Sequence, residues 1–444
     1  MTIALILFFS LLTVVLGRSM FGGWFNHVGM YGFIWGSSLA LFHVGLIAYY
    51  PLETETWMAI AAGWGAFVLG SAVIVGARYA ALREGRAAVT SSGGAHAVDP
   101  SQLVRILWIV NVITVADAIY ELYNVSRILG GVSNILALGN LLYGLRSHEG
   151  IPGAIPYVGT LTMTGSLLAG YYTAKVGKLR LVAIVAVLTA IMISVASMVR
   201  ASLIMAAILF LTGYLVERKK GAPVSGKGYG LKLKRILSIF AMVVLIVAAM
   251  ELIRGNRGMT EGFEGETSSL KKLGVGAGSF ITPSVFMYLT VHHGVLNQYL
   301  RQGTEDVPVG HYTFAPVWRV LSRLGFDTYV KQHGQFYRVP MQANTGSYLR
   351  DLHADYGFAG LVFGPFLLGM VSSVYWYRFK KNYRLSDLVI LGHVYVGVGM
   401  SLFAFMTQMG VWLGSLLFGL MISLLSTLIA RRRSGTERRS PAYG

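Results

Sequence analysis

The residues best suited to chemistry gather in one polar stretch, 254–355, between two hydrophobic segments. The stretch holds half of the chain's ten histidines, many arginines and several acids, the last of which is Asp355. Arginine presents a planar fork of donors that fits phosphate, and it stays charged even when partly buried. Histidine and carboxylate side chains can act as general bases. This stretch is therefore predicted to bind an anionic, phosphate-bearing substrate and to transfer protons.

Two residues at the end of this stretch are the candidate catalytic residues. His353 and Asp355 precede the next hydrophobic segment by a few residues, so we expect them at a membrane surface. An imidazole or a carboxylate there could take a proton from an attacking hydroxyl group. Asp355 has a second explanation, because aspartate often caps a helix and a helix is expected to begin near Tyr356 and Gly357. The sequence leaves both roles of Asp355 open.

The composition places these residues in a membrane protein. Of the 444 residues, 55% are apolar and 13% are charged, and the mean hydropathy is +0.60. Such a chain can expose its apolar area only to lipid. Most of the formal charge of +18 lies in short loops, as is usual on the cytoplasmic side of membrane proteins, which argues against a nucleic-acid partner. The absence of cysteine excludes disulfides, thiolate metal sites and cysteine nucleophiles.

The hydrophobic pattern predicts an all-α, polytopic protein with about eleven transmembrane helices. The expected spans are roughly 2–16, 32–50, 57–76, 103–120, 154–172, 180–198, 201–216, 236–253, 357–377, 387–405 and 409–429. With eleven spans, the strongly basic short loops all fall on one side, which the positive-inside rule assigns to the cytoplasm. The N-terminus is then outside, the C-terminus is inside, and the polar stretch faces outward.

This topology divides the chain into four parts. Residues 1–253 hold helices one to eight, 254–355 form a large outward loop with the candidate site, 356–430 hold helices nine to eleven, and 431–444 form a basic cytoplasmic tail. The outward loop is rich in aromatic residues, which disordered segments lack. We expect it to fold as short helices on the outer face of the bundle, and Ala315–Leu324 has helical spacing.

Three further arginines are expected near the membrane boundary. Arg254 and Arg257 lie just past a span and three residues apart, so they can face one way if the helix continues. They could bind phosphate, or they could anchor the helix by snorkelling to lipid phosphates. Arg200 lies between two apolar spans, where an unpaired charge is costly. It could bind substrate, or it could pair with a carboxylate such as Asp117 or Glu121.

The sequence lacks the common motifs for metal and cofactor binding. Adjacent His292 and His293 cannot easily bind one ion, and no H-E-x-x-H spacing occurs. No G-x-S-x-G or P-loop motif is present, and the glycine-rich run 274–278 lies in the outward loop, away from cytoplasmic nucleotides. We therefore expect no metal ion and no cofactor.

Two stretches and one loop carry a family resemblance. In Arg200–Tyr214, an arginine opens a span after a short outward turn. In Asn344–Gly360, an Asn-Thr…Tyr…Asp-Tyr-Gly…Gly run enters the next span. Together with the large outward loop late in the chain, these features resemble bacterial O-antigen polymerases of the Wzy type, also called oligosaccharide repeat unit polymerases.

The resemblance implies a GT-C-like membrane fold and a metal-independent inverting glycosyltransferase in the bacterial inner membrane. Such an enzyme polymerises undecaprenyl-diphosphate-linked oligosaccharide repeat units of the O-antigen of lipopolysaccharide, or of a related surface polysaccharide, at the periplasmic face. Its partners are the lipid-linked donor and acceptor, together with membrane lipid. The sequence leaves open whether a separate co-polymerase sets the chain length.

The resemblance also implies roles for individual residues. Arginines of the outward loops in that family are thought to hold the carrier diphosphates, a role that falls here on Arg200, Arg254 and Arg257. The looser candidates for binding diphosphate or glycan are Arg319, Arg338, Asn344 and Arg350. The acceptor hydroxyl is expected near His353 and Asp355, and which of them is the base stays open.

Two other functions compete with the polymerase. The sister family of O-antigen ligases, which transfer glycan to lipid A-core, tends to carry a His-Asn pair before the late span, where this chain has Gly346 and Ser347. That difference favours the polymerase. A lipid-linked glycan flippase places charges inside its bundle, whereas the expected spans here are nearly free of ionisable groups apart from Asp117 and His393.

Overall fold

The computed structural model describes residues 2–84, 98–139, 157–197, 199–217, 283–303, 307–328 and 335–437, together with a few positions between these ranges. The chain forms two compact units. Unit 1 consists of Met1–Gly93, Thr260–Lys381 and Val394–Gly410. Unit 2 consists of Gly94–Met259, Asn382–His393 and Val411–Gly444. The predicted sites at Arg254 and Arg257, and the predicted span 236–253 apart from one position, lie outside the described residues.

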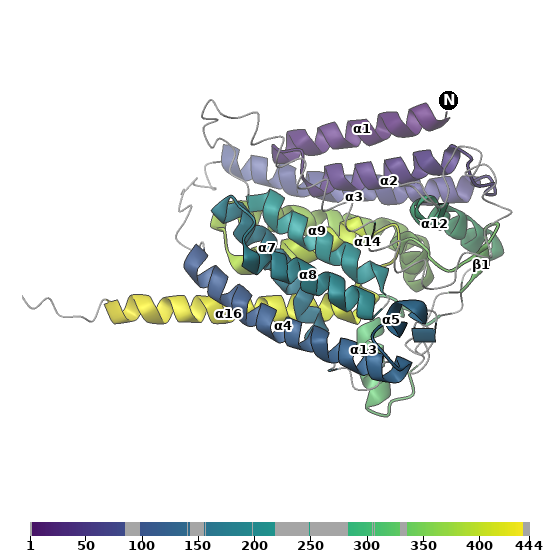
Figure 1. The fold of residues 1–444 in the computed structure, drawn as a ribbon. Coiled ribbons are helices and arrows are strands. Elements are labelled where there is room, and N and C mark those ends of the chain that lie inside the picture. Colours follow the sequence, from purple (N-terminus) through teal and green to yellow (C-terminus); the bar gives the residue numbers. More distant parts are fainter. Residues whose placement is uncertain are drawn as a thin grey trace, which may run out of the picture. The chain divides into compact units, whose positions relative to one another are not determined.

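Unit 1 is built from helices and one short ladder. Its elements are α1 (Thr2–Phe21), α2 (His27–His43), α3 (Thr54–Arg83), α12 (Pro283–Gln302), α13 (Ala315–Arg323), nearly all of α14 (Tyr348–Asn382) and the 3-10 turn η3 (Met406–Gln408). The antiparallel strands β1 (Tyr337–Arg338) and β2 (Gln342–Ala343) pair with each other. Helices α1, α2 and α3 pack against one another, and α12 packs against α2 and α3 (Figure 1).

Unit 2 is helical throughout its described part. Its elements are α4 (Pro100–Leu129), α5 (Asn134–Ala137), the 3-10 turn η1 (Val158–Thr160), α7 (Leu161–Val176), α8 (Leu181–Ala196), α9 (Arg200–Glu217) and nearly all of α16 (Gly410–Glu437). Helix α15 (Leu385–Gly399) begins in unit 2 and ends in unit 1. Helix α7 is buried along most of its length and packs against α4, α8 and α9 (Figure 1).

The helices agree with a chain that is embedded in a membrane. Within the described ranges, α1, α3, α4, α9, α14 and residues Gly410–Ile429 of α16 are long and apolar enough to cross a bilayer. Helices α8 and α15 are apolar but shorter. Each predicted span except 236–253 overlaps a helix. The all-α prediction is therefore confirmed at this level, whereas the number of spans and the GT-C-like fold stay predictions.

Glycines allow the long helices of unit 1 to approach closely. A Cβ atom at Gly70 of α3 would collide with the carbonyl oxygen of Phe366 in α14. A Cβ atom at Gly369 of α14 would collide in turn with the carbonyl oxygen of Phe67 in α3. Membrane helices gain most of their association energy from such close packing, because lipid is as apolar as the side chains themselves. Helices α3 and α14 therefore contact each other directly at their backbones.

Helix α14 is divided by a sharp turn at Gly357. This residue has φ 59° and ψ −148°, inside a helix that otherwise runs from Tyr348 to Asn382. Such angles are essentially restricted to glycine. A Cβ atom at Gly360 would collide with the carbonyl oxygen of Leu352, so the segment before the turn lies against the start of the longer part. The turn coincides with the predicted start of the span 357–377.

Helix α12 is the largest departure from the predicted outward loop. The loop was expected to hold short helices, but α12 is 20 residues long and several of its polar side chains are buried, including His293 and Asn297. Asn297 binds the chain before α3: its Oδ1 accepts from the Glu53 amide at 2.8 Å, and its Nδ2 donates to the Pro51 carbonyl at 3.1 Å. The shorter predicted helix at Ala315–Leu324 is confirmed as α13.

Replacing Gly357 by alanine tests the turn. We expect Gly357→Ala to lower stability by about 1–3 kcal/mol, because a residue with a Cβ atom is strained at these angles. The measurement is the thermal unfolding midpoint of the purified protein in detergent. The matched control is Gly397→Ala, since a Cβ atom there would meet only Leu368, at 3.7 Å. Equal midpoints for the two variants would contradict the assigned turn.

Candidate functional site

Several elements of unit 1 bring polar side chains together around the first segment of α14. These are the end of α12, the chain that follows it, the turn before α13, strand β1 and the segment Tyr348–Tyr356. We call the group the α14 cluster, and its members are Tyr299, Glu305, Tyr312, Tyr337, Arg350, Asp351, His353 and Asp355. All except His353 are almost fully buried, and His353 is half-buried.

An ion pair between the consecutive residues Arg350 and Asp351 stabilises the α14 cluster at the start of α14. Arg350 donates from Nε and Nη2 to Asp351 Oδ1 at 3.2 and 2.9 Å, and from Nη1 to the Asn344 carbonyl at 3.0 Å. Asp351 Oδ2 accepts from the amide of Phe405 at 3.0 Å and from Gln408 Nε2 at 2.9 Å. Arg350 is 4% exposed and Asp351 is fully buried. The polar atoms of both side chains therefore bind other groups of the protein, and these contacts attach the start of α14 to residues 405–408.

The beginning of the Asn344–Gly360 motif now has a physical explanation. A Cβ atom at Gly346 would lie 2.6 Å from Arg350 Nε, so glycine gives the guanidinium room. Tyr348 is buried, its hydroxyl lies 2.9 Å from that of Tyr31 in α2, and its amide donates to the Ser401 carbonyl at 2.9 Å. The motif thus positions the first segment of α14. Asn344 itself contributes a backbone carbonyl and has a half-buried side chain.

Asp355 holds the turn that precedes α13. Its Oδ1 accepts from the Tyr312 amide at 2.8 Å. Its Oδ2 accepts from the amide and the hydroxyl of Thr313, at 2.7 and 2.6 Å. One role that the sequence suggested for Asp355 is to cap the helix that begins near Tyr356 and Gly357. The carboxylate instead caps the turn before α13. Three donors thus bind this carboxylate, which is 2% exposed, and Asp355 positions the turn before α13.

His353 is held by a buried tyrosine. The hydroxyl of Tyr299 lies 2.9 Å from His353 Nδ1, and the two rings meet edge to face. Burial raises the pKa of Tyr299, and the nearby charge of Glu305 raises it further. The phenol therefore stays protonated, and its hydroxyl fixes the orientation of the imidazole. Nε2 takes no part in this contact, which leaves His353 as a candidate for proton transfer.

Glu305 was missed by the sequence analysis. Tyr312 donates to its Oε2 at 2.6 Å and Tyr337 donates to its Oε1 at 3.3 Å. Burial raises the pKa of Tyr312, and the hydrogen bond to Glu305 acts in the same direction. The two tyrosines lie 7 and 32 positions from Glu305, so no regular spacing marks the group. Glu305 and the two tyrosines add a buried carboxylate and two hydroxyls to the α14 cluster. Carboxylates and hydroxyls are groups that hydrogen-bond to sugars.

The other predicted arginines have different surroundings. Arg338 is exposed on β1. Arg319 is half-buried on α13, and burial lowers its pKa, with a further contribution from Arg323. Arg200 begins α9 in unit 2 and is half-buried. The structure therefore brings Asn344, Arg350, His353 and Asp355 together, and Arg319 and Arg338 lie on α13 and β1 of the same unit.

The histidine pair of α12 has structural contacts. His293 Nε2 lies 2.8 Å from the Ser38 hydroxyl of α2, and His292 packs edge to face on Phe403. Across the part of the chain that the structure describes, no three histidine, aspartate or glutamate side chains come together as a metal site would need.

Removing Arg350 tests whether it stabilises the fold. We expect Arg350→Ala to lower stability by about 3–5 kcal/mol, because Asp351 would remain as an uncompensated buried charge. Arg338→Ala, which removes an exposed arginine of the same unit, should change stability by no more than about 0.5 kcal/mol. Thermal unfolding of both variants in detergent measures the difference. A normal midpoint for Arg350→Ala, combined with lost activity, would instead place Arg350 on the substrate.

Comparison of the chain with protein-family models, with curated proteins and with solved structures finds no match.

Proposed function

We propose that the chain is a membrane glycosyltransferase that polymerises undecaprenyl-diphosphate-linked oligosaccharide repeat units at the periplasmic face of the bacterial inner membrane. The observation that carries this proposal is His353, held by Tyr299 just before the apolar part of α14. A lipid-linked sugar presents its reactive bond at the headgroup layer, where such a residue would meet it. The resemblance of Arg200–Tyr214 and Asn344–Gly360 to Wzy-type polymerases supports the same reaction.

The proposed reaction needs one base and a site for the leaving diphosphate. A hydroxyl oxygen of the acceptor glycan attacks the anomeric carbon of the donor and forms the new glycosidic bond. His353 Nε2 takes the hydroxyl proton as this bond forms. The bond from the anomeric carbon to the diphosphate oxygen breaks, and the diphosphate leaves with the electron pair. Attack from the opposite side inverts the anomeric configuration, and the reaction consumes no nucleotide.

Tyr299 prepares His353 for this role. A neutral imidazole carries one N–H group, so Nε2 can accept a proton only if Nδ1 carries the hydrogen. Nδ1–H then donates to the Tyr299 oxygen, 2.9 Å away. When His353 takes a second proton, this hydrogen bond becomes charge-assisted and stronger. Tyr299 therefore acts as a positioning residue that stabilises the imidazolium.

Arginines would hold the diphosphates, whose negative charge increases as the bond breaks. Arg200, Arg254 and Arg257 are assigned this role on the sequence, and Arg319 and Arg338 are assigned to glycan or diphosphate. The GT-C-like fold, the eleven spans and the outward orientation belong to the same proposal. So does a reaction without metal or cofactor, whose partners are the two lipid-linked substrates, membrane lipid and a co-polymerase if one controls chain length.

Replacing Tyr299 tests the preparation of His353. Tyr299→Phe keeps the ring and removes the hydroxyl, so kcat should fall by about 10- to 100-fold while KM changes little. The matched control is Tyr337→Phe, which removes a hydroxyl of the same cluster that donates to Glu305. This variant should lower kcat less than Tyr299→Phe does. The assay is initial rate at equal amounts of inserted protein. A change confined to KM would exclude a role for Tyr299 in proton transfer.

A reconstituted assay tests the function as a whole. Purified protein is given a synthetic polyprenyl-diphosphate repeat unit, without nucleotide or added metal, and products are separated by gel or mass. We expect a ladder of repeat multiples, which His353→Gln abolishes. Transfer of preassembled glycan to a lipid A-type acceptor would identify a ligase instead. Movement of the lipid-linked unit between leaflets, with neither product, would identify a flippase.

A further inference from the structure

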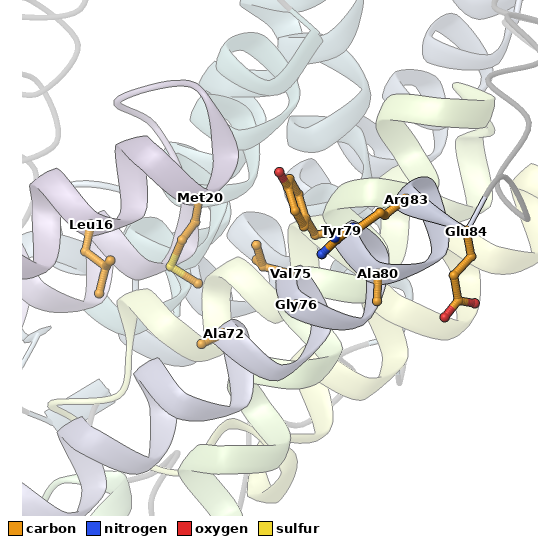
Figure 2. Close-up of a pocket in the computed structure, with 9 residues that line it drawn as sticks. All are labelled: Leu16, Met20, Ala72, Val75, Gly76, Tyr79, Ala80, Arg83 and Glu84. Carbon is orange, nitrogen blue, oxygen red and sulfur yellow. The ribbon is translucent and has the colours of Figure 1, made fainter.

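A groove of about 860 Å³ runs between α1 and α3 in unit 1. Its walls are apolar and come from Leu16 and Met20 of α1 and from Ala72, Val75 and Gly76 of α3. Figure 2 shows these side chains on both sides of the groove. The volume falls within the range of about 300–1,000 Å³ that is usual for small-molecule sites.

Polar groups lie at one end of the groove. They are Tyr79 and Arg83 of α3, together with Glu84, which directly follows the helix. Tyr79 and Arg83 are exposed, as is Glu84. The groove thus combines a long apolar part with Arg83 and Glu84 at its end, two residues of opposite charge that are consecutive in the sequence.

The length of α3 places these charges at a headgroup layer. Helix α3 has 30 residues, which corresponds to about 45 Å and matches a bilayer with its headgroups. Its first residues follow Glu53, whose amide is bound by Asn297 of α12, and α12 also carries Tyr299 of the α14 cluster. Arg83 is at the opposite end of α3. The groove therefore faces the other leaflet from the α14 cluster.

We propose that this groove binds one phospholipid whose headgroup carries both a phosphate and a primary ammonium group. The acyl chain lies along Leu16, Val75 and Gly76, Arg83 donates to the phosphate, and Glu84 accepts from the ammonium. Arginine suits phosphate because its donors are arranged in a fork. A purely anionic headgroup fits less well, because Glu84 and the negative end of the α3 dipole both repel it. This inference is independent of the proposed reaction.

Gly76 offers a way to fill the groove without disturbing the fold. A Cβ atom at Gly76 would meet no other atom within 4 Å, and Gly76 is one of the groove residues. A large side chain there would occupy the space proposed for the acyl chain. Gly65 is a matched control on the same helix, since a Cβ atom there also meets nothing within 4 Å and Gly65 does not line the groove.

The test uses full-length protein in mild detergent, stripped of lipid. Phosphatidylethanolamine, phosphatidylglycerol or phosphatidylcholine with identical acyl chains is added, and native mass spectrometry measures the bound lipid. We expect one tightly bound phosphatidylethanolamine in the wild type and in Gly65→Phe, and none in Gly76→Phe. Arg83→Gln should weaken binding of that lipid about tenfold. Glu84→Gln should remove the preference over phosphatidylglycerol.

Three results would overturn the proposal. The first is equal lipid binding by Gly76→Phe and Gly65→Phe, which would place the lipid elsewhere. The second is equal affinity for all three headgroups, which would indicate unspecific lipid at the protein surface. The third is a protein that binds no lipid and in which a photoreactive residue at position 76 forms cross-links to residues 85–97. That result would show that the chain itself fills the groove. None of these results depends on glycosyltransferase activity.

Discussion

The backward turn at Gly357 is the constraint on which the candidate site depends. It separates the polar segment Tyr348–Tyr356 from the apolar remainder of α14 and places Leu352 against Gly360. A continuous helix would carry both segments along one axis and would pull the polar side chains away from the elements that they bind. The turn instead lets the first segment lie against residues 405–408 and the turn before α13. It does so at one residue, because only glycine adopts these angles at little cost.

Buried polar groups then fix that segment in place. A buried charge is costly unless other groups satisfy it, and each acid here binds a separate part of the chain. Asp351 binds residues 405–408, and Asp355 binds the turn before α13. Arg350 neutralises Asp351 and binds the Asn344 carbonyl. These contacts explain why charged residues are dense in the motif without requiring that each one touch a substrate. His353, whose Nε2 takes no part in the hydrogen bond to Tyr299, stays a candidate for proton transfer.

The sequence predicts the helices better than it predicts the roles of charged residues. Apolar runs locate most long helices, because burial in lipid requires a continuous apolar surface. The same criterion misses α12, since His293 and Asn297 lower its hydropathy and find partners only in the folded chain. Glu305 is missed for a related reason, because its tyrosines come from distant positions. Whether an arginine such as Arg350 is free or already paired depends on tertiary contacts that composition cannot reveal.

The glycines of helix α3 differ in how closely neighbouring parts of the protein approach them. At Gly63 an added Cβ atom would lie 2.7 Å from Leu349 Cδ2, so α3 packs tightly against the segment that carries His353. At Gly70 the contact is with the α14 backbone, and at Gly76 there is no contact at all. One face of α3 therefore packs tightly on α14, whereas a Cβ atom at Gly65 or Gly76 would meet no atom within 4 Å. The proposed site for proton transfer needs tight packing, because an error of an ångström in position can slow a reaction about a hundredfold. The open positions have no such requirement, so the groove between α1 and α3 can lie at Gly76 without loosening the contact at Gly63.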